Sequence, residues 1–527
     1  MAQQDDGSGR APVVIVRPTT SVTSGVAVTQ KLVGAAVAFG DILRRTFGPN
    51  GLDKMMYKTN GENAITNDGA KIVADLLVKH PAAKAFVQLA ESQENACGDG
   101  VTGCLLFASE LMKEAGRLLE RGVHPLALVE AYQQSMLHTL EVLDSRSMTD
   151  VDADALRAVA KTAMVGKSAE AGGDELARLL VDAMLTVQES GRPVRAEHVR
   201  MAKRGHDSLQ ETTLIQGIIV NKKFDSERTP KISQPSKVLA LTCPLTIQKS
   251  KRDAEIEIER PDQMLAFLDA EEKLIQEKID ILASSGAKAI FTSKEVDDRI
   301  QHACFDNSIL LVGMMEDDGI EDIAAATGAT LINHLDDVES ASLGSLQSAL
   351  VEISEHEDGR HTRLVVDAGP ASGLVTIDVG GGQGAAVEEY IRAMYDALRS
   401  IESVLEDPAT LLGGGSFHIA AALKLREIAE SVSGRQRLAI EGFARALETI
   451  PSTLAMNAGE DQIDTLLQLR AAHRNQSGRF GVCSDGQIGE IEGVLLSAHA
   501  ISHALQAAVE TACGLLRVDQ VISSRGD

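Results

Sequence analysis

The stretch Gly98-Asp99-Gly100-Val101-Thr102-Gly103 lies between two segments with helical periodicity, residues 81–96 and 102–121. Three glycines within six residues break a helix and form a tight turn, so the second segment begins at this turn. The first N–H groups of a helix have no partner within it and attract anions. A carboxylate at Asp99 suits such a site when a cation lies between it and a phosphate. The stretch therefore predicts either a phosphate and Mg²⁺ site or a helix capped by Asp99.

Two more glycine-containing turns precede this one. Gly48-Pro49-Asn50-Gly51 ends the helical periodicity of residues 31–47, because a Gly/Pro cluster does not continue a helix. Thr66-Asn67-Asp68-Gly69 comes before a helical segment at residues 70–78. Helices are thus expected to begin or end at all three turns, and two of the turns carry an aspartate.

Asp68, Asp99 and Asp396 are the candidate acids for phosphate chemistry. Hydrolysis of a nucleoside triphosphate needs a metal-bound carboxylate and at least one more that orients the attacking water. Asp396 belongs to the helical segment of residues 387–405 and lies about 140° from the middle of its apolar stripe. From helix geometry alone, Asp396 is most simply a solvated residue.

Other glycine-rich motifs give weaker indications. Residues 98–103 fit GxGxxG, but a dinucleotide site needs a strand before the motif, and a helix is expected there. Residues 380–385 (GGGQGA) follow the strand-like residues 374–377, yet no later strand offers an acid for the ribose. Residues 165–168 resemble the end of a P-loop, but Lys161 occupies the position of its first glycine.

The chain changes character along its 527 residues, a length that allows three or four domains of about 150 residues each. The first third is predicted to be mainly helical, residues 225–373 alternate between strands and helices, and the rest is helical again. The alternation is typical of an α/β domain with a partly parallel sheet, including a long amphipathic helix over residues 262–284. Helical parts on both sides of an α/β centre indicate an inserted domain, with the termini packed together.

Composition excludes several classes of protein. The formal net charge of −25 argues against general binding to nucleic acids or anionic membranes, which needs a basic surface. Aromatic residues make up 3% of the chain, so stacking on bases or sugars has little support. Residues 1–11 are too polar for a secretory signal, charges interrupt the long apolar stretches, and the six cysteines form no CxxC pair. We expect a cytoplasmic protein with buried thiols.

Taken together, the ordered motifs resemble the group II chaperonins, which are the archaeal thermosome and the TRiC subunits of eukaryotes. The likeness extends over about residues 27–522. The matching stretches, in chain order, are residues 48–55, 66–70, 80–84, 98–102, 165–170, 253–256, 395–398, 413–415, 439–444, 450–451, 457–459 and 516–522.

The resemblance implies an α/β multidomain chaperonin fold with a nested domain order. A mainly helical equatorial ATP-binding domain would consist of residues 1–147 and 406–527. A small intermediate domain would consist of residues 148–218 and 374–405. The inserted α/β apical domain, which would bind substrate, would be residues 219–373.

The resemblance also implies an ATP-hydrolysing subunit of a double ring that encloses non-native polypeptides. Identical or homologous subunits would be its partners, and nucleic acids and membranes would not. A helical protrusion around residues 249–267 would form a built-in lid, so no separate co-chaperonin is expected. The cofactors would be ATP or ADP and Mg²⁺.

For the site, the resemblance assigns a role to each matching residue. Asp99 would bind Mg²⁺, while Asp68 and Asp396 would orient and activate the attacking water. Asp396 would reach the nucleotide only when the intermediate domain closes. Lys167 matches a lysine that senses the γ-phosphate. The other nucleotide-binding positions would be Gly48, Gly100, Val101, Thr102 and Gly103 at the phosphates, and Gly414 and Gly415 near the ribose and base.

The chain departs from the family's pattern at several positions. Val101 lacks a hydroxyl that commonly meets phosphate, and Cys483 replaces an acid or amide. His418 stands where the family has a glutamate, and Leu496-Ser497 replaces an acidic residue and a proline that serve the ribose. Each lost hydrogen bond is worth about 0.5–1.5 kcal/mol, so several together would weaken ATP affinity about tenfold or more.

Two other functions stay open at this point. One is a divergent chaperonin paralogue that fills a ring position and has weak or no ATPase activity. The other is a dinucleotide-dependent enzyme that uses residues 380–385. ATP turnover separates the first from an active subunit, and NAD(P) binding tests the second.

Overall fold

A computed structural model defines the architecture of two compact units, and each is described by itself. Unit 1 comprises Met1–Ala155, Val165–Lys167 and Asp407–Asp527, and unit 2 comprises Leu156–Met164 and Ser168–Glu406. The structure describes residues 20–57, 63–76, 78, 81–189, 191, 193–204, 208–220, 229–247, 261–356, 359–369, 372–381, 385–475 and 479–524. Residues 249–260 of the expected protrusion and residues 382–384 of the GGGQGA motif lie outside this set.

Unit 1 is built mainly of helices, as the sequence predicts. In chain order they are α1 (Val26–Arg44), α2 (Gly69–Asp75), α3 (Pro81–Cys97), α4 (Val101–Glu120), α5 (Pro125–Arg146), α12 (Ser416–Ser431), α13 (Arg435–Leu447), α14 (Thr449–Ala458), α15 (Gln462–Asn475) and α16 (Ala498–Leu516). Short antiparallel pairs join β2 (Lys54–Tyr57) to β3 (Asn63–Thr66), β15 (Thr410–Leu412) to β18 (Leu495–Ser497), and β16 (Phe480–Val482) to β17 (Ile488–Glu490).

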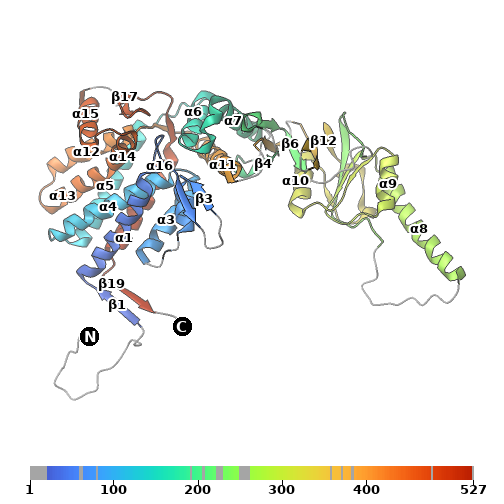
Figure 1. The fold of residues 1–527 in the computed structure, drawn as a ribbon, viewed down its shortest axis with the longest axis horizontal. Coiled ribbons are helices and arrows are strands. Elements are labelled where there is room, and N and C mark those ends of the chain that lie inside the picture. Colours follow the sequence, from blue (N-terminus) through green and yellow to red (C-terminus); the bar gives the residue numbers. More distant parts are fainter. Residues whose placement is uncertain are drawn as a thin grey trace, which may run out of the picture. The chain divides into compact units, whose positions relative to one another are not determined.

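The first and last described segments of the chain pair with each other. β1 (Thr20–Ser24) runs antiparallel to β19 (Gln520–Ser524), and the two strands lie side by side (Figure 1). For the described residues, the prediction that the N- and C-terminal parts of the chain pack together is therefore confirmed.

Helix α4 is the centre of the unit 1 core. Leu105, Leu106 and Leu111 are fully buried on it, and α1, α13 and α16 pack around it. The rings of Phe107 on α4 and Phe443 on α13 meet edge to face with centroids 5.5 Å apart, a favourable aromatic geometry. Because α4 is covered on several sides, its first turn is held firmly in place.

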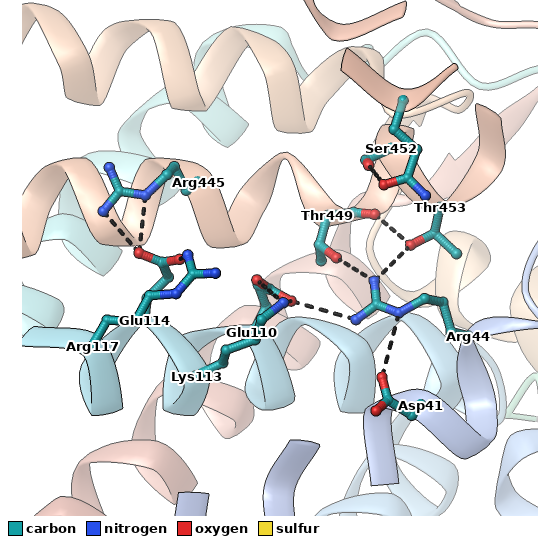
Figure 2. Close-up of polar contacts among 11 residues, drawn as sticks. Asp41, Arg44, Glu110, Lys113, Glu114, Arg117, Arg445, Thr449, Ser452 and Thr453 are labelled. Atoms are coloured by element: carbon teal, nitrogen blue, oxygen red, sulfur yellow. Dashed lines mark hydrogen bonds and ion pairs between the residues drawn. The ribbon is translucent and has the colours of Figure 1, made fainter. Parts of the chain in front are cut away.

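Two buried carboxylates on α4 carry the polar contacts of this core (Figure 2). Glu114 accepts hydrogen bonds of 2.9 and 2.8 Å from the guanidinium of Arg445 on α13. Glu110 binds Lys113 at 2.9 Å and Arg44 of α1 at 3.4 Å. Removing a cationic partner would leave a buried carboxylate uncompensated, although the partial exposure of Arg445 and Lys113 screens part of that cost. These pairs therefore hold α1, α4 and α13 in a defined arrangement.

Unit 2 contains the predicted, partly parallel sheet. In the order β10-β7-β8-β9 its strands are β10 (Leu331–Ile332), β7 (Ser236–Leu241), β8 (Ala289–Thr292) and β9 (Leu310–Val312), all parallel. β11 (Gly344–Leu346) pairs antiparallel with β7. The intervening helices are α8 (Pro261–Ser284), α9 (Asp298–Asp306) and α10 (Asp317–Thr327).

Two smaller sheets complete unit 2. One has the order β12-β13-β6, with β12 (Ser348–His356), β13 (Gly359–Asp367) and β6 (Gly217–Val220). The other has the order β4-β14-β5, with β4 (Val199–Lys203), β14 (Val375–Val379) and β5 (Thr213–Ile215). The division of this unit into an intermediate and an apical domain stays a prediction.

Helix α11 (Ala385–Glu406) shows where the sequence interpretation was wrong. Its apolar stripe is buried as expected, but it also packs on α7 (Gly173–Glu189) and on the 3₁₀-helix Ser168–Gly172. Glu402, off the stripe, accepts a 2.8 Å hydrogen bond from the Ala196 N–H. Asp396 is only 8% exposed. It is therefore a buried acid and not a solvated one, because the helix is covered on more than one face.

None of the six cysteines forms a disulfide bond, and five of them are buried. Burial raises the pKa of Cys304 to about 11 and that of Cys513 to about 11. These thiols therefore stay protonated and unreactive at neutral pH. The prediction of buried thiols is confirmed for all but Cys483, which is half-buried.

Candidate functional site

The turn before α4 places Asp99 outside the helix. α3 ends at Cys97 and α4 begins at Val101, so Gly100 takes the N-cap position, with φ +80° and no side chain to cap. Asp99 Oδ1 lies 3.6 Å from the Nζ of Lys167. The interpretation of Asp99 as the helix cap is wrong, because the carboxylate is one residue too early and faces a lysine.

The Asp68 turn has a different local role. Asp68 is the N-cap of α2, and its Oδ1 accepts a 2.9 Å hydrogen bond from the Ala70 N–H. A Cβ added to Gly69 would lie 2.4 Å from Thr102 Oγ1 in the first turn of α4. Only a residue without a side chain fits this close approach. The starts of α2 and α4 are therefore in direct contact.

The turn that carries Lys167 contacts two of the other turns. The side-chain amide of Asn67 donates to the Gly166 carbonyl. Gly166 has φ +76°, and a Cβ there would lie 2.8 Å from the Gly48 carbonyl oxygen. This contact places Lys167 between the Gly48 turn and the Asp99 turn.

The Gly413–Gly415 turn precedes α12. The Gly414 carbonyl accepts a 2.9 Å hydrogen bond from the Val482 N–H. A Cβ on Gly415 would lie 2.6 Å from Pro451 Cβ. The side-chain amide of Asn50, in the Gly48 turn, donates at 2.6 Å to the Ser484 carbonyl. The residues around Gly414 are thus linked to those around Gly48.

Helix α14 lies between these two groups of turns. A Cβ on Gly48 would lie 2.3 Å from Leu454, and one on Gly103 would lie 3.9 Å from Ile450. At its start, Thr449 accepts a 3.1 Å hydrogen bond from Arg44 of α1 (Figure 2). We call residues 48–51, 66–69, 98–103 and 165–167 the Asp99 side, and residues 413–415, 482–484 and 494–497 the Gly414 side, of one glycine-loop cluster.

The structure also explains what the departures from the family pattern do. Val101 is 4% exposed and belongs to the apolar core, so it offers the cluster only its backbone N–H. Burial and the nearby Asp485 raise the pKa of the Cys483 thiol, which keeps it neutral. Burial lowers the pKa of His418 on α12 to about 4, so its ring is uncharged at neutral pH. Leu496 lies in β18, opposite Leu411 of β15.

Sequence reasoning missed Gln93, a fully buried amide on α3. Its side chain donates a 2.9 Å hydrogen bond to the Asp99 carbonyl. A signal was present: Ala82, Phe86, Leu89 and Cys97 form a buried helical stripe, and Gln93 is the polar residue on it. Such a residue needs hydrogen-bond partners inside the protein.

The donor set fits a magnesium ion held mainly by phosphate. Among the described residues, no three or more His, Cys, Asp or Glu side chains gather where they could hold a metal alone. Mg²⁺ commonly binds through one or two carboxylates together with substrate phosphates. Asp99 would offer one such carboxylate beside the start of α4, where the N-cap residue Gly100 has no side chain. Asp68 and Asp99 belong to unit 1 and Asp396 to unit 2, so the joint action of the three acids stays a prediction.

Comparison with known proteins identifies the family. The TCP-1/cpn60 chaperonin family matches residues 39–525. The chain therefore belongs to this family and is a chaperonin subunit. Among its relatives is the thermosome subunit beta of Methanothermobacter thermautotrophicus, 35% identical over 519 residues, which are 98% of this chain and 95% of the relative. The thermosome subunit alpha of Archaeoglobus fulgidus is 36% identical over 525 residues, 98% of this chain and 95% of that one.

A further relative is thermosome subunit 1 of Haloferax volcanii, 35% identical over 520 residues, with 97% of this chain and 92% of the relative covered. The resemblance to group II chaperonins is confirmed. Within the described part of the chain, no helix combines the length and apolarity that crossing a membrane requires.

Proposed function

We propose that this chaperonin subunit binds and hydrolyses Mg²⁺-ATP at the glycine-loop cluster. The observation that carries the proposal is the convergence of the Asp68, Asp99 and Lys167 turns at the uncapped first turn of α4. Two acids, one lysine and the first N–H groups of a helix suit a phosphate with a divalent cation.

Each side chain of the Asp99 side has a separate task. Asp99 holds Mg²⁺, which when bound neutralises charge on the phosphate oxygens. Lys167 supplies a positive charge for the γ-phosphate and lies 3.6 Å from Asp99. Asp68 orients the attacking water, and its hydrogen bond to the Ala70 N–H fixes the direction of its carboxylate. Gly100, Thr102 and Gly103 let the backbone approach the phosphates closely.

The Gly414 side takes the ribose and base. Gly414 and Gly415 bring the backbone close to Val482 and Pro451 without an intervening side chain. Leu496 and Cys483 offer no charged hydrogen-bond acceptor to the ribose or base. Recognition at these two positions therefore rests on backbone groups and apolar contact.

Asp396 completes the site by domain movement. Its carboxylate is buried on α11 of unit 2, and it activates the water once the intermediate domain closes. Such gating couples hydrolysis to a conformational step. In the assembled protein, homologous or identical subunits form two stacked rings, and closure encloses a non-native polypeptide under a lid formed by the protrusion.

The alternative of a paralogue without turnover is not favoured, since Asp68, Asp99, Lys167 and Asp396 are all present. The test is ATP turnover by purified rings of the wild type and of Asp396→Asn. We expect turnover to fall about 100-fold or more, as for other general bases, with nucleotide still bound. Glu388→Gln, an exposed acid on the same helix, is the matched control and should turn over like the wild type. Equal rates for Asp396→Asn and wild type would defeat the proposal.

A further inference from the structure

Gln93 is a buried polar residue with no task in the proposed mechanism. It lies on the core face of α3, six residues before Asp99, and its side chain is fully buried. We infer that Gln93 is a positioning residue that fixes the Asp99 turn, and that His503 on α16 fixes the orientation of the Gln93 amide. This inference rests on the proposed function of Asp99.

Three hydrogen bonds define the role of Gln93. Its Nε2 donates to the Asp99 carbonyl at 2.9 Å and to the Ala500 carbonyl at 3.2 Å. Its Oε1 lies 2.8 Å from the Nδ1 of His503. The amide thus joins the Asp99 turn to the first turn of α16. Its Nε2 and its Oε1 both have hydrogen-bond partners.

The chemistry of an amide permits only one orientation here. Two backbone carbonyls face the same atom of Gln93, so that atom must be the NH₂ group, because an oxygen would repel both. Oε1 must then accept a hydrogen bond, and His503 must carry a proton on Nδ1 to donate it. Burial and the nearby His499 lower the pKa of His503, although Glu510 acts in the opposite direction. A neutral ring protonated on Nδ1 satisfies these contacts.

The Asp99 turn needs such a support because glycines flank it. Gly98 has φ +67° and Gly100 has φ +80°, and glycine has many other backbone conformations available. A Cβ on Gly100 would lie 3.4 Å from the Gln93 Nε2, so the turn runs directly along the amide. With its carbonyl held by Gln93, Asp99 keeps its carboxylate directed toward Lys167, 3.6 Å away.

Mg²⁺-dependent binding of a fluorescent ADP analogue to assembled wild-type and variant protein tests this inference. Gln93→Met keeps the length of the side chain and removes its hydrogen bonds. We expect the Mg²⁺ concentration at half-saturation to rise about tenfold, because losing a hydrogen bond or two costs that much. Binding of the analogue in excess EDTA should change less than about twofold, since the phosphate-binding backbone is retained. If Gln93 had a merely structural role, its substitution would weaken binding of the analogue to the same degree with Mg²⁺ and in EDTA.

Two variants of His503 keep the test decisive if Gln93→Met fails to fold. His503→Leu removes the donor and should raise the Mg²⁺ requirement about threefold. His503→Gln restores a donor and should return it to the wild-type value. Gln506→Met is the matched control, because Gln506 is an exposed amide on the same helix, bonded only to Ser502 among the contacts described for it.

The outcomes separate the two claims. If the wild type shows no Mg²⁺-dependent binding, the proposed function fails and this inference fails with it. If the wild type binds and the Gln93 and His503 variants share its Mg²⁺ requirement, only the inference is overturned. If the variants lose affinity for the ADP analogue equally with Mg²⁺ and with EDTA, the inference is also overturned.

Discussion

Two turns of unit 1 have nearly the same sequence and use their aspartates differently. In Asn67-Asp68-Gly69 the aspartate is the N-cap of α2, with Oδ1 2.9 Å from the Ala70 N–H. In Gly98-Asp99-Gly100 the glycine is the N-cap of α4, and the aspartate lies 3.6 Å from Lys167. A shift of one residue relative to the helix start decides whether a carboxylate serves the helix or faces outward.

The comparison teaches how to judge an aspartate near a helix start. A capping carboxylate satisfies N–H groups that would otherwise lack a partner, so it contributes about 1 kcal/mol to folding. A carboxylate before a glycine N-cap leaves those groups to a ligand. In the proposed mechanism Asp68 combines both uses, whereas the N-cap position of α4 is taken by Gly100 and not by Asp99. The predictions below test this difference, beginning with the largest effect.

Asp99→Asn should abolish function and spare the fold. We expect ATP turnover to fall about 100-fold or more, because an amide is a poor ligand for Mg²⁺. Hydrogen exchange of the α4 amides should stay close to the wild-type level, since the N-cap residue of α4 is Gly100 and is unchanged. Turnover within twofold of the wild type would contradict the assignment of Asp99 to the metal.

Gly166→Ala should weaken nucleotide binding about tenfold by displacing the Lys167 turn. A Cβ there would lie 2.8 Å from the Gly48 carbonyl, and φ is +76°, which costs an L-residue about 1–2 kcal/mol. Gly459→Ala is the matched control, because Gly459 has φ +92° and open space around a Cβ. Titration of each variant with a fluorescent ADP analogue measures the effect. Equal affinities for the two variants would show that contact with Gly48 does not matter.

Local features and the general layout of this fold were predictable from the sequence, whereas individual side-chain contacts between distant residues were not. The segments 81–96 and 102–121 correspond to α3 (Pro81–Cys97) and α4 (Val101–Glu120) within one residue. Periodicity and glycine act over a few residues, so they are visible in one sequence. The packing of the N-terminal part on the C-terminal part, and the parallel sheet, were predicted from the order of helical and strand-like segments along the chain.

Asp396 and Gln93 both depend on neighbours far away in the chain. Asp396 was assigned to solvent because one stripe of α11 is apolar, but 3₁₀ and helical segments some 200 residues earlier cover other faces. The Gln93 amide bonds to Ala500, which is 407 residues away. A helix pattern gives the direction of a side chain but not what lies opposite it.

Asp68→Ala should separate the cap from the chemistry. The loss of the cap should increase hydrogen exchange of the first α2 amides about fivefold, which corresponds to about 1 kcal/mol. Asp68→Asn should keep the exchange at the wild-type level, because asparagine caps helices as well as aspartate does. Both variants should lose turnover. If Asp68→Asn hydrolysed ATP normally, Asp68 would be a helix cap alone.

His418 extends the comparison to the Gly413–Gly415 turn before α12. It is a titratable residue in the first turn of that helix, and it is buried. Burial lowers its pKa from 6.5 to about 4. Between these two values the unfolded chain binds a proton that the folded chain does not, so folding stability falls as the pH drops below 6.5. At pH 6.0, local opening of α12 should be about fourfold more frequent than at pH 8.

Hydrogen exchange of the α12 amides at both pH values, corrected for intrinsic exchange, measures this effect. His418→Gln has no titrating ring. The ratio of its α12 exchange rates at pH 6.0 and pH 8 should therefore approach one. α2 provides an internal reference, because it contains no histidine. A fourfold change that persists in His418→Gln would assign the acid sensitivity to another group, and His418 would then be an ordinary packed side chain.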